Sequence, residues 1–428
     1  MPRWTPLTLT LLVILIVFNL AQCAVLVRKA EKGTDFTVFY NTGKLLDAGA
    51  GAELYRGKDE TTEWLRTIPP FGQMVIAPFG QGTIRAAALG WGVFNLVLLG
   101  ATAWTLRAFM ARLDSKSRAF GAVWSWSVLL LLTMAPASIQ VGQFSVLFTA
   151  CWVFALGLLA TRFRALAGAP LAIPIAIKIY PALLLAIPLM ARRPRWLVGT
   201  LVFVALWSAA PFLVYGARMP ELSVSFWRNA IASGGGRVAE AQNASSPANQ
   251  GLDAVALRYL TSGQPIQERF SNLPHLSVPV PTALKLINLT RVVVILVSLW
   301  VGWRFWRRGQ LAPLWGQAML MALMCAALYA ILPGAKTRYA IYEFPAFWPV
   351  LVCAFAARRL NKARALWAWS AFAFVCLMLI AFTPSPLRPY GLGWFAAVAL
   401  WASNCLTLWR WSRNAPMLAS NSLNLPQT

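Results

Sequence analysis

Apolar windows of membrane-spanning length recur along the whole chain, and they restrict its fold more than any other feature. Each window covers roughly 17 to 25 residues, the length of helix that crosses about 30 Å of hydrocarbon. Because only helices and closed barrels satisfy their backbone groups in lipid, windows of this length predict an all-α integral membrane protein. We predict ten full spans, near residues 8–26, 84–106, 121–139, 144–161, 196–215, 285–303, 312–332, 339–357, 365–383 and 391–409.

One further apolar stretch, residues 166–190, is too short to cross a membrane twice. It lies between basic residues at 162–164 and 192–195 and contains Pro174 and Pro181. We predict a pair of short or re-entrant helices broken around these prolines. Irregular backbone at membrane depth is tolerated only where it is buried in protein or lines a cavity.

Composition agrees with a membrane protein and bears on its partners. The chain is 59% hydrophobic and 12% charged, which excludes a water-soluble globular protein. Its net charge of +25 would also suit a nucleic-acid binder, but the basic residues form short clusters between the apolar windows. This placement follows the positive-inside rule, so we expect anionic membrane lipids as partners and no nucleic acid.

The basic clusters also predict the orientation of the chain. With the N-terminus inside, clusters at 107–118, 162–164, 192–195, 304–308, 358–364 and 410–413 all face the cytoplasm. Two long polar segments, residues 27–83 and 216–284, then lie outside. We therefore predict one multi-pass domain over residues 1–428, in the inner or plasma membrane, with an extracytoplasmic active site.

Acidic residues are concentrated in these two outer loops, in or beside which lie eleven of the thirteen Asp and Glu residues. Asp35 follows the first span by about nine residues and starts an aromatic-rich stretch that would keep its carboxylate near the bilayer surface. Asp35 is the best candidate for a general base. The alternative interpretation is a solvated loop aspartate.

A series of short motifs follows Asp35 in a recognisable order. They are Tyr40, the stretch 51–55 (Gly-Ala-Glu-Leu-Tyr), 68–71 (Ile-Pro-Pro-Phe), 77–79 (Ala-Pro-Phe), 142–145 (Gly-Gln-Phe-Ser) and 177–181 (Ile-Lys-Ile-Tyr-Pro). This order resembles glycosyltransferase family 87, the GT-C-type mannosyltransferases that use polyprenyl-phosphate mannose. Asn249 and Gln250 look like part of an outer-loop motif of that family, with Gly251 where Ser is common.

The chain departs from the family pattern late in the sequence. The family often has a histidine near the outer start of a late helix, where this chain has residues 336–339 (Lys-Thr-Arg-Tyr). Its single histidine, His275, lies in the second outer loop instead.

The resemblance implies a GT-C-type polytopic bundle and an inverting transfer. In such a reaction an acceptor hydroxyl attacks the anomeric carbon of a lipid-linked hexose, mannose in the family, and polyprenyl phosphate leaves. The acceptor would be a lipid or a glycan, and Asp35 matches the catalytic aspartate that takes the hydroxyl proton. A lipid-phosphate donor confines the reacting carbon to the interface, which a first-loop carboxylate can reach.

The leaving phosphate requires cations, for which the sequence offers three candidates. Lys178 lies in an apolar stretch, where an ammonium is costly unless it faces a cavity or a partner; the alternative is a lysine snorkelling to the surface. Lys336 and Arg338, on a short outer turn, would clamp the same phosphate, or be an exposed charge pair without a role.

Amide side chains are the remaining candidate ligands. Gln143 opens a helix at the outer face, where it would hydrogen-bond sugar hydroxyls or cap the helix. Asn249 and Gln250 are expected to bind substrate on the strength of the family motif.

We predict no cofactor and no metal site. No Asp-x-Asp pair is present to hold a nucleotide-sugar metal, and the six cysteines have no paired spacing. The main alternative function is a transporter or lipid flippase, because broken helices carrying Lys178 would suit a transporter's midplane site. No second pair of broken helices forms the inverted repeat that such proteins use. A non-catalytic scaffold is a third interpretation.

Overall fold

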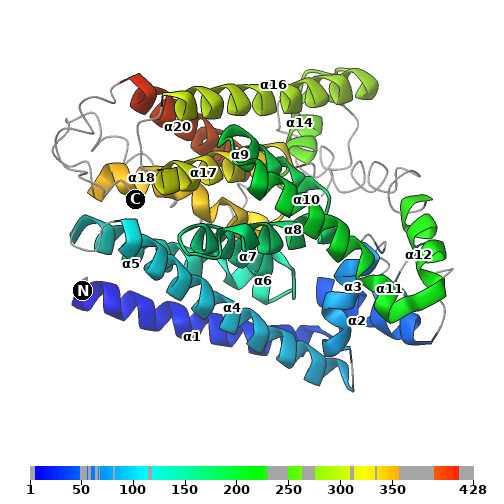
Figure 1. Ribbon diagram of the computed structural model, residues 1–428. Helices are drawn as coiled ribbons and strands as arrows, with labels where there is room; N and C mark the ends of the chain where they lie inside the picture. The colour runs from blue at the N-terminus through cyan, green and yellow to red at the C-terminus, as the bar shows by residue number, and fades with distance from the viewer. Residues whose placement is uncertain are drawn as a thin grey trace.

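The computed structural model describes residues 5–48, 55, 59–62, 66, 68–80, 82–113, 118–228, 249–262, 275–308, 313–332, 335–355 and 390–413, and its regular elements are helices. Figure 1 labels them, with η for 3₁₀ helices. In chain order they are α1 (Pro6–Lys29), α2 (Asp35–Asp47), α3 (Pro70–Ile76), η2 (Ala77–Phe79), α4 (Ile84–Leu113), α5 (Arg118–Met134), α6 (Pro136–Ile139), α7 (Ser145–Leu159), η3 (Arg164–Ala167), α8 (Gly168–Ile177), η4 (Tyr180–Leu185), α9 (Ala186–Met190), α10 (Pro194–Ala209), α11 (Pro211–Tyr215), η5 (Gly216–Arg218), α12 (Met219–Ser225), α14 (Leu252–Leu260), α16 (Val280–Arg307), α17 (Pro313–Ile331), η7 (Thr337–Phe347), α18 (Trp348–Phe355) and α20 (Leu392–Arg413).

Seven helices of the described chain are long and apolar enough to cross a membrane, and they coincide with seven of the ten predicted spans. The window 144–161 forms the shorter helix α7. The window 339–357 is not one continuous α-helix: its first part belongs to η7, which contains Pro345, and α18 follows. Since proline has no backbone N–H, it interrupts regular α-helical bonding. The window 365–383 lies outside the described residues, so a total of ten spans stays a prediction.

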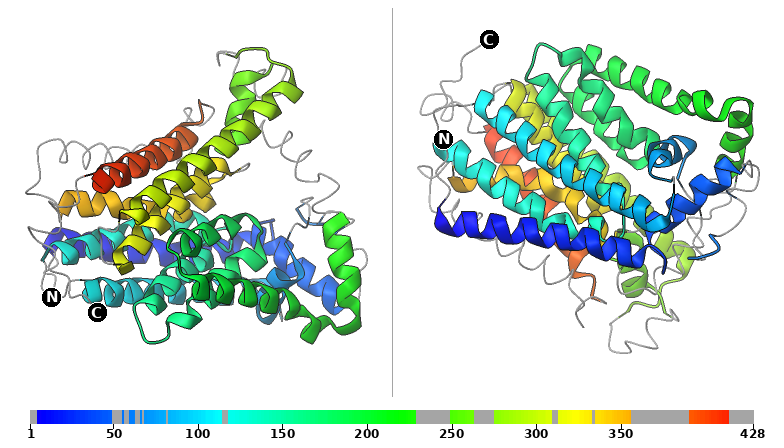
Figure 2. Two further views of the ribbon diagram at one scale, coloured as in Figure 1. Left: turned by 45° about the horizontal axis from the view of Figure 1, so that its top comes forward. Right: turned by 90° about the horizontal axis from the view of Figure 1, so that it is seen from below.

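The helices pack in layers around α17. Of its spanning window 89% is buried, against 17% for α1 and 22% for α16. In Figure 1, α16 and α20 lie on one side of α17, while α7, α4 and α1 follow one another on the other side. The left view of Figure 2 shows the same separation of α16 from α1. The apolar side chains exposed on α1, α10 and α16 are those expected to face lipid.

The apolar stretch 166–190 forms two short helical segments, Arg164–Ile177 and Tyr180–Met190. The break lies at Lys178, which is extended (φ −148°, ψ 131°), between Pro174 inside α8 and Pro181 at the start of η4. These segments pack against α7, α10 and α17. The residues before the break are buried in protein, whereas Lys178 and Tyr180 at the break are partly exposed and Ile179 is exposed.

Four short helices lie together at one end of the bundle. In Figure 1, α2, α3, α11 and α12 lie together at the right, whereas α1 begins at the opposite end. Leu46 of α2, Tyr55 and Leu222 of α12 form a small buried apolar cluster there. This cluster joins the segments after the first and fifth predicted spans.

Candidate active site

Asp35 is the first residue of α2, and its position is set by the residues around it. Gly33 has φ +103°, a conformation that favours glycine. Thr34 caps the helix: its hydroxyl accepts from the Thr37 N–H (3.2 Å), and its own N–H donates to the Thr37 hydroxyl (2.8 Å). The Thr37 hydroxyl in turn donates to the Ala30 carbonyl (2.7 Å). This capping box ties the start of α2 to the end of α1.

The turn that precedes α7 packs directly against the start of α2. The Phe36 N–H donates to the Val141 carbonyl (3.0 Å), and the Trp91 indole donates to the Gly142 carbonyl (3.0 Å). Gly142 has φ +70°, and a Cβ at this position would lie 2.4 Å from the Phe36 Cβ. Only glycine allows this contact, which brings Gln143 next to Asp35.

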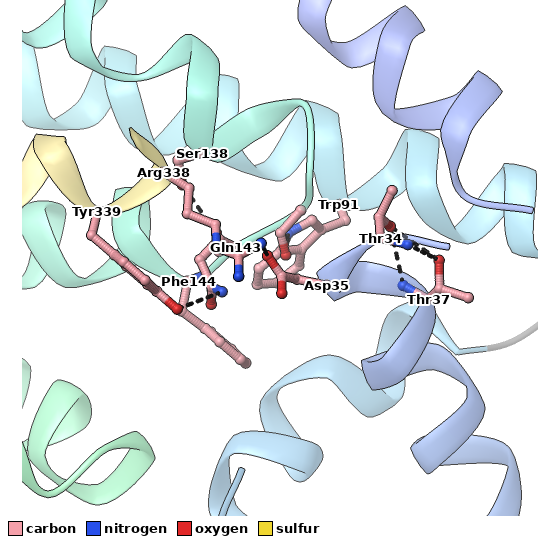
Figure 3. Close-up of polar contacts among 10 residues, drawn as sticks. Thr34, Asp35, Thr37, Trp91, Ser138, Gln143, Phe144, Arg338 and Tyr339 are labelled. Atoms are coloured by element: carbon pink, nitrogen blue, oxygen red, sulfur yellow. Dashed lines mark hydrogen bonds and ion pairs between the residues drawn. The ribbon is translucent and has the colours of Figure 1, made fainter. Parts of the chain in front are cut away.

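Arg338 forms an ion pair with Asp35 across the molecule. Figure 3 shows the guanidinium and the carboxylate facing one another, Asp35 from α2 and Arg338 from η7. Both side chains are largely buried, at 14% and 10% exposed. Burial by itself would lower the pKa of Arg338, but Asp35 and Tyr339 raise it above its usual value, so Arg338 is a cation.

Gln143 connects the same turn to η7. Its Nε2 donates to the Tyr339 hydroxyl (3.4 Å), and its Oε1 accepts from the Phe144 N–H (3.1 Å). The second bond sets the orientation of the amide. Gln143 is buried and its side chain lies between Asp35 and Tyr339 in Figure 3.

Lys178 and Lys336 bring two more positive charges to Tyr339. The Lys178 Nζ lies 5.0 Å from the centre of the Tyr339 ring and 5.9 Å from that of Tyr180. Lys336 interacts with both Arg338 and Asp35; burial and Arg338 lower its pKa, and Asp35 opposes them. Three cations therefore gather around Tyr339, next to Asp35, an arrangement suited to an anionic ligand.

Tyr339 is also the first ring of an aromatic stack that supports the site. Its ring stacks on Tyr342 (5.7 Å between centres, 22°), which stacks on Phe148 of α7 (5.8 Å, 12°). The Tyr180 hydroxyl donates to the Tyr342 hydroxyl (3.0 Å). In the sequence, Tyr339 is noticed only as part of the turn 336–339, because no local pattern distinguishes it from other aromatic residues.

The sequence model of glycosyltransferase family 87 matches residues 67–333 of this chain. The match spans more than half of the chain. This chain belongs to glycosyltransferase family 87. No curated protein and no solved structure matches the chain.

As a family 87 protein, the chain is a membrane glycosyltransferase, which argues against the transporter and scaffold interpretations. The matched region contains Gln143 and Lys178 but not Asp35, Lys336 or Arg338. Tertiary packing joins residues from within and beyond that region in one place. The resemblance to family 87 inferred from the motifs is confirmed.

Asn249 and Gln250 of this glycosyltransferase contact backbone behind the cation cluster. The Gln250 N–H donates to the Ala335 carbonyl (2.6 Å), and its Oε1 accepts from the Gly393 N–H (3.2 Å). The Asn249 Oδ1 accepts from the Gly251 N–H (3.0 Å). Both side chains are buried. These contacts anchor the turn that carries Lys336, and a direct role in substrate binding stays a prediction.

Proposed function

We propose that this chain is an inverting glycosyltransferase that takes a hexose from a polyprenyl-phosphate donor and adds it to a hydroxyl of a lipid or glycan acceptor. The proposal names mannose as the sugar, following the family resemblance, and the extracytoplasmic face of the inner or plasma membrane as the location. The observation that carries it is the gathering of Lys178, Lys336 and Arg338 around Tyr339, where Arg338 also pairs with Asp35.

The charge of the cluster suits a lipid-phosphate leaving group. A sugar phosphodiester carries one negative charge, and the phosphate monoester that leaves carries about −1.5 to −2 at pH 7. Negative charge therefore grows on the phosphate in the transition state, where preorganised cations stabilise it most. No nucleotide and no divalent cation is required in this scheme.

Asp35 is the group that takes the acceptor proton. Its ion pair with Arg338 would orient the carboxylate before substrate arrives. A bound donor phosphate would then share Arg338, leaving a carboxylate oxygen to accept the hydroxyl proton while the acceptor attacks from the opposite face of the sugar. The Gln143 side chain, which lies between Asp35 and Tyr339, would hydrogen-bond the sugar or the phosphate.

The direct test is a transfer assay on the purified full chain in lipid nanodiscs. Polyprenyl-phosphate [¹⁴C]mannose is offered with a membrane extract as the acceptor source, in parallel with the glucose analogue and with GDP-[¹⁴C]mannose. We expect label in a lipid or glycan product from the polyprenyl donor, unaffected by EDTA. Label that enters product only from the nucleotide sugar, or only when Mn²⁺ or Mg²⁺ is added, would contradict the proposal.

The location is tested separately by cysteine accessibility in intact cells. Lys32→Cys and Arg193→Cys place thiols at exposed positions near the start of α2 and at the start of α10. Four of the native cysteines, Cys23, Cys151, Cys325 and Cys405, are buried. A membrane-impermeant maleimide should label position 32 but not position 193. The reverse pattern would place Asp35 in the cytoplasm and exclude the extracytoplasmic mechanism.

A further inference from the structure

The Tyr339 hydroxyl lies at the centre of the cation cluster, and its partners determine where its hydrogen can point. A phenolic oxygen has two acceptor positions and one O–H donor. Gln143 donates one hydrogen bond to it (3.4 Å), and the Phe144 N–H holds that amide in the required orientation.

With the Gln143 amide N–H directed at its oxygen, Tyr339 has its own hydrogen left to donate. Within the described ranges no oxygen accepts that hydrogen. The ring is partly exposed rather than buried, and Figure 3 shows its hydroxyl next to the Gln143 amide, on the side of the site that holds Asp35. The phenol is therefore prepared to donate to a ligand.

Two cations flank this ring. The Lys178 Nζ lies 5.0 Å from the ring centre and the Arg338 Cζ lies 5.5 Å from it. An anion that contacts both cations must lie against Tyr339. The donor phosphate of the proposed reaction is such an anion.

We propose that Tyr339 is a further catalytic residue, which donates a hydrogen bond to the phosphate oxygen that leaves the anomeric carbon. This role rests on the proposed function. As the acceptor oxygen bonds to the anomeric carbon, the bond from that carbon to the phosphate oxygen breaks and its electron pair stays on the phosphate. The acceptor proton passes to Asp35, and Tyr339 keeps its proton while its hydrogen bond strengthens with the growing charge.

The experiment compares Tyr339→Phe with the parent chain in the nanodisc assay. Loss of a donor that acts on developing charge should lower kcat by about 10²- to 10³-fold. Affinity for polyprenyl-phosphate mannose, measured by direct binding, should fall much less than kcat, because the leaving oxygen gains its negative charge only in the transition state. Thermal unfolding should match the parent, because the ring and its stacking are retained.

Tyr342→Phe is the matched control. It removes a hydroxyl from the next ring of the same stack, and that hydroxyl accepts from Tyr180 instead of facing the cations. We expect its kcat to stay within about tenfold of the parent value.

Each contrary result has a distinct meaning. A parent chain that transfers no sugar from the polyprenyl donor overturns the proposed function and this role together. An active parent with Tyr339→Phe at near-parent kcat overturns the role of Tyr339 alone. Equal losses of kcat in Tyr339→Phe and Tyr342→Phe would mean that Tyr339 only supports the site. A loss of donor binding that accounts for all of the lost turnover would mean that Tyr339 acts in ground-state binding. Either result overturns its catalytic role.

Discussion

Two groups of cations at different places in the bundle show how the same residue types acquire different roles. Arg107 and Arg307 are exposed and lie over indole rings, 5.7 Å from Trp124 and 5.1 Å from Trp303. Arg338 is largely buried and faces Asp35. Basic residues beside tryptophans at helix ends are typical of a membrane–water interface. Burying a cation and a carboxylate costs desolvation free energy, and a functional site is one reason for a protein to keep such a pair.

The difference teaches that net charge and cation–π contacts do not identify the site of a membrane glycosyltransferase. Both groups contain positive charge next to aromatic rings. Of the two groups, only the one at Tyr339 combines cations from two chain segments with an acidic residue from a third. Removing its members one at a time should affect transfer, whereas removing the interfacial arginines should not.

The largest effect is expected for Asp35→Asn, which keeps the shape of the side chain and removes the proton acceptor. Turnover should fall by about 10²- to 10⁴-fold, while folding and donor binding persist because the cations that hold the phosphate remain. Single-turnover rates and direct donor binding separate the two effects. Asp47→Asn, at the exposed far end of the same helix, is the control and should transfer at the parent rate. An Asp35→Asn protein with near-parent turnover would move the base elsewhere, with Glu53 next to be tested.

Arg338→Gln compares the two cation groups directly. It removes the ion pair with Asp35 and one phosphate ligand, so kcat/KM for the polyprenyl donor should fall by about 10²- to 10³-fold. Arg307→Gln removes an equal charge over Trp303 and should leave kcat/KM close to the parent value. Equal losses in both variants would mean that overall charge, rather than position, controls activity.

Gly142→Ala tests whether the close contact between the turn before α7 and α2 positions Asp35. The added Cβ would lie 2.4 Å from the Phe36 Cβ, and such overpacking costs about 1–3 kcal/mol in addition to the backbone strain of about 1–2 kcal/mol. Gly82→Ala is the matched control, because Gly82 also has positive φ (+80°) but no atom within 4 Å of the added Cβ.

Both variants should lower the unfolding temperature, Gly142→Ala more than Gly82→Ala, and only Gly142→Ala should lose transfer activity beyond its loss of folded protein. Equal destabilisation with equal activity would show that the turn does not position Asp35.

The smallest effect concerns pH and Lys336, whose pKa is lowered by burial and by Arg338. A lysine with a lowered pKa loses its charge at a lower pH than usual, so donor affinity should be highest below that pKa and weaken as pH rises through it. In Lys336→Arg the charge persists to higher pH, and the weakening should move upward. Donor binding measured across a pH series checks this; identical profiles for parent and variant would exclude Lys336 as a phosphate ligand.

Asp35 and Lys178 stand out in the sequence for physical reasons that remain valid in the structure. Asp35 follows a span and precedes a membrane-level aromatic stretch, and Lys178 interrupts an apolar one. Tyr339 has no such signal. Asn249 and Gln250 matched a family motif, yet their side-chain oxygens accept hydrogen bonds from backbone N–H groups. No pattern of residue types distinguishes such contacts from contacts with substrate.

The sequence by itself determined that the chain is a helical membrane protein, where seven of its spans lie, and to which family it belongs. These properties depend on the local hydropathy of 20-residue windows and on short motifs, both of which act within one segment. Only the tertiary structure decided that Asp35 meets Arg338, and that Lys178 from a broken helix lies over Tyr339. Such contacts depend on how helices distant in sequence pack, which side-chain volumes and close approaches such as that at Gly142 decide.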